Sequence, residues 1–222
     1  MNKFRNSTEV FEYYLLKILQ DGIAHGETQA LFDVGFTIVN PLDNQIKSKF
    51  RKFSTKYAES EWKWYLSGDP SIEELRKIHG SVPKIWERHA DEEGKVRSNY
   101  GWQWLRKNQI NKVLEKLEKD RDSRQCVISI YDGKEVDTYE YDTPCTTTIQ
   151  FQIVQDKLNM SVHMRSNDLW YGFCNDQYMF SKLLEMCASR LSVAPGTYYH
   201  QATNLHLYNN QIINKQLWKS SN

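Results

Sequence analysis

Several side chains in this sequence have the types and spacing to perform chemistry on a bound ligand, and Cys145 is the candidate nucleophile among them. It follows Pro144 where a strand is expected to begin, and a thiol at the mouth of a strand can be tuned towards the nucleophilic thiolate. A lone cysteine is more often a small buried hydrophobic residue, so this fragment leaves both interpretations open. The structural interpretation is the expected one for Cys126, Cys174 and Cys187.

Glu61 is expected on the apolar face of a helix. Tyr57, Glu61, Trp64 and Tyr65 recur at i, i+4, i+7 and i+8, so the carboxyl group shares a helical face with three aromatic rings. A carboxylate there is costly unless it is paired or partly protonated, which is the condition of a general acid or base. The alternative is a rim residue whose carboxylate reaches water.

Arg165 and Ser166 end a predicted strand, and a planar guanidinium beside a hydroxyl group suits a phosphate. Arg124, which precedes another predicted strand, is a second phosphate candidate. Taken alone, either arginine fits a surface ion pair. His206 and Tyr208 fall on one face of a strand, where they suit a sugar hydroxyl or a structural hydrogen-bonded pair.

Asp176 lies eleven positions after Arg165, at the start of a predicted helix. An ionised carboxylate only accepts hydrogen bonds, whereas an amide both accepts and donates, so the two groups at a base-binding position select different pyrimidines. The alternative is a structural role, because a carboxylate in the first turn of a helix is favourable.

A mixed set of helices and strands must position these residues. Caps and apolar periodicity predict helices over 7–21, 45–67, 71–78, 105–119 and 174–190, with a helical piece at 210–219. Strands are predicted over 30–39, 125–131, 146–155, 158–165 and 197–207, with a candidate bulge at Gly35 and a hairpin turn at Asp156-Lys157. Because no repeat or linker interrupts them, the prediction is one α+β domain over residues 1–222.

Composition narrows the classes of function. Lys and Arg together number 29 against 28 Asp and Glu, so no overall basic field points to nucleic acid. The four cysteines show no paired spacing, which favours a reduced cytoplasmic compartment, and neither a signal peptide nor an apolar run of about 20 residues is present. No phosphate-loop, dinucleotide or zinc motif occurs, so no metal is expected. Because no long apolar run occurs, no membrane partner is expected either.

Together these fragments resemble the thymidylate synthase family, specifically its pyrimidine hydroxymethylase branch. The resemblance implies a mixed twisted sheet packed against helices and a homodimer formed through the sheet. The matching pieces occur in the family's order: Glu61-Trp-Lys-Trp-Tyr-Leu-Ser-Gly-Asp69, Lys84-Ile-Trp86, Ser98-Asn-Tyr-Gly101, Asp122-Ser-Arg124, Pro144-Cys145, Gln150-Phe151, Arg165-Ser-Asn-Asp168, Gly172-Phe-Cys-Asn-Asp176, Pro195-Gly196 and His206-Leu-Tyr208.

The resemblance implies a role for each matching residue. Cys145 matches the nucleophile that adds to C6 of the pyrimidine, and Glu61 matches a carboxylate that relays protons at the far edge of the ring. Arg124 matches an arginine donated across the dimer interface. The other implied positions are phosphate and substrate contacts at Arg165, Ser166 and Gln150, sugar 3′-hydroxyl contacts at His206 and Tyr208, Asp168 near the base carbonyl and the folate, and cavity walls at Trp86 and Tyr100.

Asp176 takes the place where thymidylate synthases hold an Asn. A carboxylate there suits cytosine, because it accepts from the N4 amine and from N3 once that atom is protonated, and it repels uracil O4. The implied reaction is transfer of a one-carbon unit from 5,10-methylenetetrahydrofolate to C5 of dCMP with addition of water, in a host cytoplasm if a phage encodes the protein. The alternatives are a CMP hydroxymethylase, a thymidylate synthase acting on dUMP, and a catalytically inactive nucleotide-binding protein.

Four features depart from the synthase pattern. Gln125 stands where synthases have a second Arg, and Thr146 replaces the His that usually follows the nucleophile. His25 is the substitute expected for the basic residue of the mobile phosphate loop. The sequence stops fourteen residues after Tyr208, and a short tail is expected to make water harder to exclude.

Overall fold

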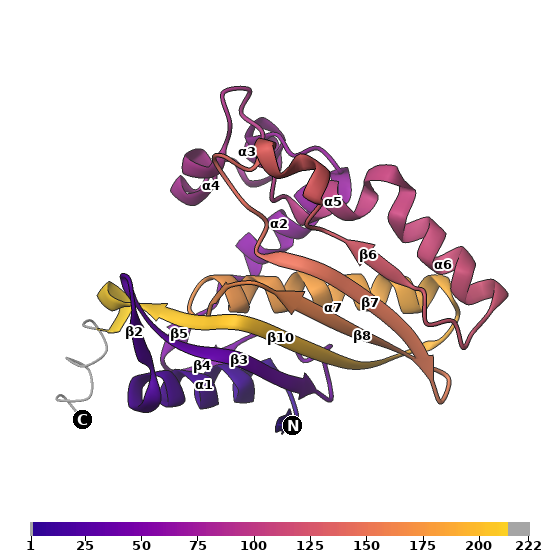
Figure 1. The fold of residues 1–222 in the computed structure, drawn as a ribbon, viewed down its shortest axis with the longest axis horizontal. Coiled ribbons are helices and arrows are strands. Elements are labelled where there is room, and N and C mark those ends of the chain that lie inside the picture. The colour runs from indigo at the N-terminus through magenta and orange to yellow at the C-terminus, as the bar shows by residue number, and fades with distance from the viewer. Residues whose placement is uncertain (1, 213–222) are drawn as a thin grey trace.

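A twisted sheet forms the centre of the computed structural model, which describes residues 2–212 (Figure 1). The strand order is β1-β3-β10-β8-β7-β6, with β2 paired to β3 and β9 paired to β10. Parallel pairs (β1/β3, β8/β10 and β9/β10) alternate with antiparallel ones, so the sheet is mixed. The strands are β1 (Asn2–Phe4), β2 (Ile23–His25), β3 (Thr28–Ile38), β6 (Val127–Ser129), β7 (Thr146–Val154), β8 (Lys157–Met164), β9 (Asn167–Asp168) and β10 (Ala194–Tyr208).

Two helices cover one face of this sheet. The helix α1 (Ser7–Asp21) packs on β3, and α7 (Gly172–Arg190) packs on β8 and β10. Phe36 of β3 joins them, because its ring meets Tyr14 of α1 and Phe173 of α7. All three aromatic residues are buried, and burial of such side chains is the main favourable contribution to folding.

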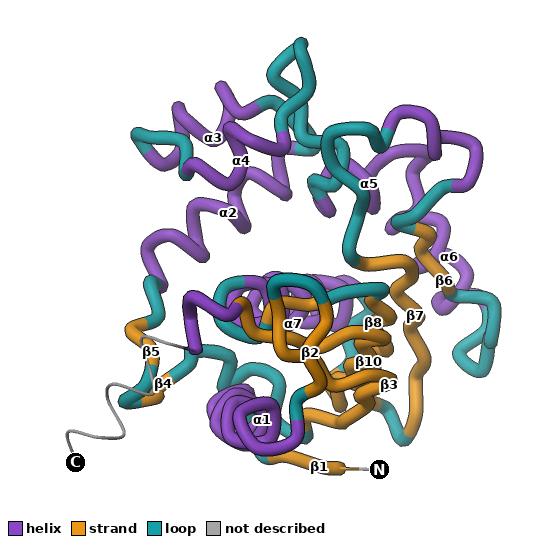
Figure 2. The backbone as a smooth tube through the Cα atoms, turned by 60° about the vertical axis from the view of Figure 1, so that its left-hand side comes forward, coloured by secondary structure: helices purple, strands orange, loops and turns teal. Residues whose placement is uncertain are grey.

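The remaining helices form a second group that contacts α7 through α2 (Figure 2). The group comprises α2 (Thr55–Ser67), α3 (Ile72–His79), α4 (Lys84–His89), α5 (Tyr100–Leu105) and α6 (Gln109–Lys119), with short 3-10 turns η1 (Arg106–Asn108) and η2 (Gly133–Thr138). A small hairpin, β4 (Lys47–Ser48) with β5 (Arg51–Lys52), lies beside α1 before this group begins. Trp64 and Tyr65 of α2 and Trp104 of α5 are buried at the centre of the group. The group therefore has an aromatic core that is continuous with that of the sheet.

The predicted strands and the helices predicted over 7–21, 71–78 and 174–190 are confirmed, with shifts of a few residues at their ends. The β7–β8 hairpin turns at Gln155 and Asp156, one residue earlier than expected, and both have the positive φ of a tight turn. Gly35 is not a bulge, because the pairing of β3 with β10 runs through it in register. Its lack of a side chain instead makes room for the hydroxyl of Tyr199, which would lie 2.6 Å from a Cβ atom.

Two predicted helices are wrong at their N-terminal ends. Over 45–67 only Thr55–Ser67 is helical, because Ser54 caps the helix and the preceding residues form the β4–β5 hairpin. Over 105–119 the chain breaks at Lys107 and Asn108, which have positive φ, and α6 begins at Gln109. Most of the helical piece expected at 210–219 lies outside the described residues.

Candidate active site

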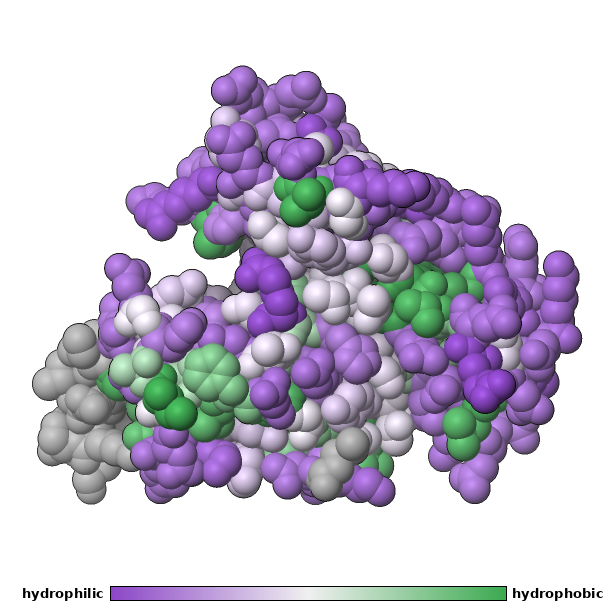
Figure 3. All heavy atoms as spheres, in the orientation of Figure 1, coloured by the Kyte–Doolittle hydropathy of each residue, from purple (hydrophilic) through white to green (hydrophobic). Residues whose placement is uncertain are grey.

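The ends of several strands meet beside a hollow in the molecular surface. Figure 3 shows this hollow on the left, between the α3–α4 region and the end of the sheet near β2. The start of β7 and the ends of β8 and β10 face α2 and the N-terminal part of α7 there (Figures 1 and 2), and the short β9 pairs with the end of β10. This arrangement brings together residues that are more than 100 positions apart in the sequence.

Cys145 lies directly before β7 and is only partly buried, whereas the other three thiols are fully buried. The guanidinium of Arg165 reaches it from the end of β8, with Nη2 3.8 Å from Sγ. The same guanidinium donates to the carbonyl oxygens of Thr143 and Pro144, so it also fixes the loop that presents the thiol. Burial raises the pKa of Cys145 to about 11, and the positive charge of Arg165 opposes that rise.

Glu61 points its carboxyl group into the same region from α2. Its Oε1 accepts from the hydroxyl of Tyr65 at 3.1 Å, and its Oε2 is buried with no hydrogen-bond partner among the described residues. Burial, reinforced by the negative charge of Asp176, raises the pKa of Glu61 to about 8. The sequence placed Glu61 on an apolar helical face, and the structure confirms this, since the side chain is 3% exposed.

Asp176 projects from α7 towards Glu61. Its Oδ2 accepts from Nδ2 of Asn167 at 2.7 Å. Enclosure by the surrounding protein raises the pKa of Asp176 to about 7, the hydrogen bond from Asn167 opposes the rise, and the charge of Asp168 adds to it. Because α7 begins at Gly172, Asp176 lies beyond the first turn, so the alternative of a structural role in the first turn is wrong.

Asp168 is anchored to the backbone at the end of β9. Its carboxylate accepts from the N–H groups of Trp170 at 2.8 Å and Tyr171 at 3.2 Å. Burial raises the pKa of Asp168 and lowers the pKa of His206, and the two groups partly offset these shifts in each other. The ring of Tyr208 packs edge-on against His206, which places both predicted sugar contacts beside the anchored carboxylate.

Aromatic side chains line the side of the region formed by the helices. Trp86 of α4 donates from Nε1 to the hydroxyl of Tyr57 at 2.7 Å and packs edge-on against Trp64. Tyr100 of α5 is buried, and burial together with the charges of Asp176 and Cys145 raises its pKa. The site therefore combines a thiol, three carboxyl groups, a guanidinium and flat aromatic walls.

A sequence model described as thymidylate synthase matches residues 40–221. The chain belongs to the thymidylate synthase family. It is 31% identical, over an alignment of 185 residues, to the deoxycytidylate 5-hydroxymethyltransferases of Enterobacteria phages T4 and T6. Each alignment covers 76% of this chain and 73% of the phage protein. As a member of this family, the protein is a folate-dependent one-carbon transferase.

The comparison with solved structures identifies the fold of the same family. Thermostable thymidylate synthase A from Bacillus subtilis superimposes with a TM-score of 0.80 at 20% identity, covering 95% of this chain and 83% of that protein. The predicted α+β fold, with a mixed sheet packed against helices, is confirmed. In this family the ligands are a pyrimidine nucleoside monophosphate and methylenetetrahydrofolate.

Gln150 and Arg124, two of the predicted substrate contacts, do not lie beside Cys145 within a single chain. The side chain of Gln150 is on the face of β7 opposite the buried Ile149 and Phe151, and its amide is 3.5 Å from the carbonyl oxygen of Arg124. Arg124 is exposed, and no hydrogen bond or ion pair with a described residue engages its guanidinium. Ser166, in contrast, follows Arg165 at the rim of the site and is partly buried.

The departures from the synthase pattern also have defined places. Gln125 is exposed and accepts from Nζ of Lys116, away from the thiol. Thr146 is fully buried next to the nucleophile, and its hydroxyl interacts with the side chain of Tyr100, whose pKa it lowers against the larger effect of burial. His25 lies on β2 with its ring edge-on to Phe32. Gln125 and Thr146 are uncharged and so do not supply the basic groups of the synthase pattern, whereas the substitution by His25 stays a prediction.

Asn167 and Asp142 are site residues that sequence reasoning missed. Asn167 stands inside the motif Arg165-Ser-Asn-Asp168, but nothing in its type or spacing indicates a contact with Asp176. Asp142 precedes the nucleophile by three residues, accepts from the N–H of Ser98 at 3.3 Å, and its charge opposes ionisation of Cys145. A proline-containing loop with no periodicity gave no signal for it.

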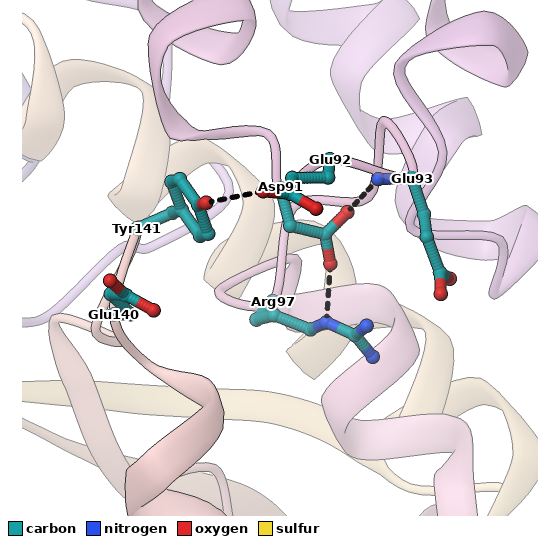
Figure 4. A pocket seen from close by; sticks show the side chains of 6 residues that line it. All are labelled: Asp91, Glu92, Glu93, Arg97, Glu140 and Tyr141. Atoms are coloured by element: carbon teal, nitrogen blue, oxygen red, sulfur yellow. Dashed lines mark hydrogen bonds and ion pairs between the residues drawn. The ribbon is translucent and has the colours of Figure 1, made fainter.

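A separate hollow of about 290 Å³ lies near the loop before Asp142 (Figure 4). Its walls are mainly acidic: Asp91, Glu92, Glu93 and Glu140, with Arg97 and Tyr141. Arg97 is already paired with Asp91 at 2.8 Å, so no free positive charge faces the hollow. Such walls repel phosphate and carboxylate groups, and the hollow does not serve the chemistry described above.

Within residues 2–212, no cluster of three or more His, Cys, Asp or Glu side chains is arranged to hold a metal ion. None of the helices found there is both long enough and apolar enough to cross a membrane.

Proposed function

We propose that this protein transfers a one-carbon unit from 5,10-methylenetetrahydrofolate to C5 of dCMP and completes the reaction with water, giving 5-hydroxymethyl-dCMP and tetrahydrofolate. The observation that carries the proposal is the carboxyl group of Asp176 close to Cys145 and Glu61, since its charge raises the pKa of both. An acid at that position has the hydrogen-bonding capacity for cytosine. The similar phage proteins, named deoxycytidylate 5-hydroxymethyltransferases, support the same substrate.

Cys145 acts first in this proposal. Its thiolate adds to C6 of the pyrimidine, which pushes electron density onto C5 and makes C5 a carbon nucleophile. The positive charge of Arg165 favours the thiolate, because it lowers the pKa that burial raises. Arg165 still has N–H donors beyond the two that hold the Thr143–Pro144 loop, and these suit the phosphate of the substrate together with Ser166.

Glu61 moves protons at the other edge of the base. Its pKa of about 8 allows it to hold a proton at neutral pH and to release it during turnover. The unpartnered Oε2 is the atom available to a water molecule or to the base. In the proposed sequence C5 bonds to the one-carbon unit of the folate, and loss of the C5 proton with cleavage of the carbon–nitrogen bond to tetrahydrofolate leaves an exocyclic methylene group on C5. Water then adds to this methylene group, ionised Glu61 accepts the proton of the water, and expulsion of the thiolate of Cys145 from C6 restores the aromatic ring.

The aromatic wall suits the folate. A pterin is a flat ring system, and Trp86 presents a partly exposed ring beside Tyr57 and Trp64. Methylenetetrahydrofolate supplies the one-carbon unit when bound there. Tyr100 closes the cavity between this wall and Asp176, and its neutral hydroxyl group keeps that side polar.

The sugar and the base carbonyl have their own contacts in this proposal. His206 and Tyr208 hold the 3′-hydroxyl group, and their packing against each other restricts both side chains. Asp168 is fixed by two backbone N–H groups and so can orient the base carbonyl and the folate without rotating.

A homodimer completes the phosphate site in the proposal, with Arg124 donated to the partner subunit. Arg124 is exposed in the loop before β6, and its carbonyl oxygen accepts from Gln150 on the sheet face that also carries the partly buried His163 and Gln201. Mixing Arg124→Ala with Cys145→Ala protein after subunit exchange should restore activity, because each hybrid dimer regains one complete site. Half of the dimers are hybrids and half of their sites are complete, so about a quarter of wild-type activity is expected.

The decisive experiment is the product mass from dCMP. Wild-type protein is incubated with methylenetetrahydrofolate and, separately, dCMP, CMP or dUMP. Hydroxymethylation adds the elements CH2O, whereas methylation adds CH2. Methylated dUMP as the sole product would identify a thymidylate synthase and reject the proposal, and a product from CMP alone would reassign the sugar.

A second measurement separates the enzyme from an inactive nucleotide-binding protein. dCMP tritiated at C5 should lose its label to water when wild-type protein and folate are present, and Cys145→Ala should lose this activity. If the wild-type protein releases no tritium but still binds dCMP, the chain binds nucleotides without catalysis.

A further inference from the structure

Asn167 and Asp176 form a closely packed pair. Asn167 lies on β9, is 2% exposed, and donates from Nδ2 to Oδ2 of Asp176 at 2.7 Å. Gly172 covers the contact, because a Cβ atom there would lie 3.1 Å from Nδ2 and 3.4 Å from Oδ2. The backbone of Asn167 pairs with Leu205 of β10, so its position does not depend on its side chain.

The remaining polar atom of this amide has no partner. Oδ1 of Asn167 is buried and accepts no hydrogen bond from a described residue. A buried acceptor without a partner is unfavourable, so a ligand with an N–H group to spare is stabilised beside it. An exocyclic amine has two N–H groups, one for Oδ2 of Asp176 and one for Oδ1 of Asn167, whereas a carbonyl oxygen has none.

The hydrogen bond also makes the two oxygens of Asp176 unequal. An oxygen that accepts an N–H bond is a poorer site for a proton than one that does not, so a neutral Asp176 carries its proton on Oδ1. Without Asn167, the proton can reside on either oxygen, and the carboxyl group can present two opposite donor–acceptor orders.

These two orders correspond to the two bases. Cytosine presents an acceptor at N3 and a donor at position 4, and uracil presents the reverse. A neutral acid with its proton fixed on Oδ1, facing N3, fits cytosine only, whereas a neutral acid with a free proton fits both. An ionised acid fits cytosine protonated at N3 and rejects uracil, whether or not Asn167 is present.

We propose that Asn167 is a specificity-determining positioning residue, which fixes the proton-bearing oxygen of Asp176 and so keeps the site selective for cytosine in both ionisation states of that acid. This inference rests on the proposed function and adds a residue and a pH dependence to it. Enclosure raises the pKa of Asp176 to about 7, so both ionisation states occur near neutral pH.

Other titratable groups face Asp176, and the effects of their titration must be distinguished from those of Asp176. Glu61 titrates in an overlapping range, but it is present in wild type and variant alike, so its effect cancels in a comparison of the two. The groups are Tyr57, Glu61 and Tyr65 of α2, Tyr100 of α5, Cys145 before β7, Asp168 of β9, Cys174 of α7 and Tyr198 of β10.

The test measures kcat/KM for tritium release from dCMP and from dUMP at about pH 6 and about pH 8.5, in wild type and in Asn167→Ala. In wild type the dCMP/dUMP ratio should stay constant within about threefold. In Asn167→Ala it should fall at least tenfold at about pH 6 and stay near the wild-type value at about pH 8.5. Asn175→Ala, which alters the partly buried neighbour of Asp176 on α7, should behave as wild type.

A structural role alone would lower activity with both nucleotides equally and leave the ratio unchanged at both pH values, which overturns the proposal. Asn167→Asp keeps the size of the side chain but removes the N–H donor, and it should lose selectivity at about pH 6, as Asn167→Ala does. If neither variant folds, affinities of the wild type decide: a ratio of dissociation constants for dUMP and dCMP that collapses tenfold at about pH 6 contradicts a fixed proton.

The direction of selectivity tests the proposed function separately. A wild type that prefers dUMP rejects the proposed substrate. A wild type that prefers dCMP, with an Asn167→Ala variant of unchanged pH dependence, rejects only the role of Asn167.

Discussion

Asp176→Asn should move the base preference of this protein from cytosine towards uracil. The introduced amide can accept from N3–H of uracil and donate to O4 once the side-chain amide of Asn167 turns over, so that the unpaired Oδ1 of Asn167 accepts from the new NH2 group in place of the donor Nδ2. In that orientation its NH2 group opposes the N4 amine of cytosine. The wild-type carboxyl group makes the reverse discrimination, because an ionised acid repels O4 and accepts from the amine.

The size of the effect follows from the number of contacts. Two edge atoms of the base face position 176, and a hydrogen bond to a charged group contributes about 1.5 kcal/mol at the lower end of its range. Changing both contacts therefore alters the relative binding of the two transition states by about 3 kcal/mol. The dCMP/dUMP ratio of kcat/KM should fall about 100-fold, and because the new amide can turn back, the preference need not invert fully.

The assay is tritium release from dCMP and dUMP at one pH, with methylenetetrahydrofolate present and thermal unfolding as the check on folding. Because Cys145 and Glu61 are unchanged, both nucleotides pass through the same later steps, and these cancel in the ratio. An active, folded Asp176→Asn protein with an unchanged dCMP/dUMP ratio would refute the reasoning that position 176 reads the base.

Three further predictions concern the acids and the thiol. Glu61 has a folded-state pKa of about 8, above its unfolded value, so its contribution to stability is present below about pH 4 and is lost as the pH rises through about 8. Glu61→Gln should therefore increase the unfolding free energy of the free protein by a few kcal/mol at about pH 8.5, which raises its melting temperature, and change both very little at about pH 4.5. An equal change in melting temperature at the two pH values would contradict the assignment. Iodoacetamide should alkylate Cys145 before the three buried thiols, at a rate that rises towards pH 11 and falls in Arg165→Ala, as mass spectrometry of the peptides can show. Cys145→Ala should abolish tritium release while dCMP still binds, as measured by calorimetry, and loss of both together would point to a structural role instead.

The parts of the site that the sequence predicted are those set by local periodicity. Glu61 was expected on an aromatic face because Tyr57 and Tyr65 lie four residues to either side, and the helix α2 places them there. The β7–β8 hairpin was also predicted, from two apolar strands joined by a short polar turn. The order of the family motifs then identified the fold, and the structural comparison confirms it.

The parts that the sequence did not predict depend on tertiary contacts. The hydrogen bond between Asn167 and Asp176 joins a two-residue strand to a helix, and it exists because Gly172 lets the two elements approach closely. The region before Thr55 has residues compatible with a helix, yet it forms the β4–β5 hairpin, where Arg51 donates to the carbonyl oxygen of Trp170. Local propensity contains no information about such partners.

The ionisation of Asp176 links recognition of the base to activation of the thiol. A negative charge on Asp176 raises the pKa of Cys145, in addition to the larger effect of burial. An ionised Asp176 therefore opposes the thiolate that must attack C6. A neutral Asp176 that donates from Oδ1 to N3 of cytosine removes this opposition and leaves Arg165 as the main charge acting on the thiol. Recognition of cytosine by a neutral acid and formation of the nucleophile are then compatible in one site, whereas recognition by an ionised acid would work against the first chemical step.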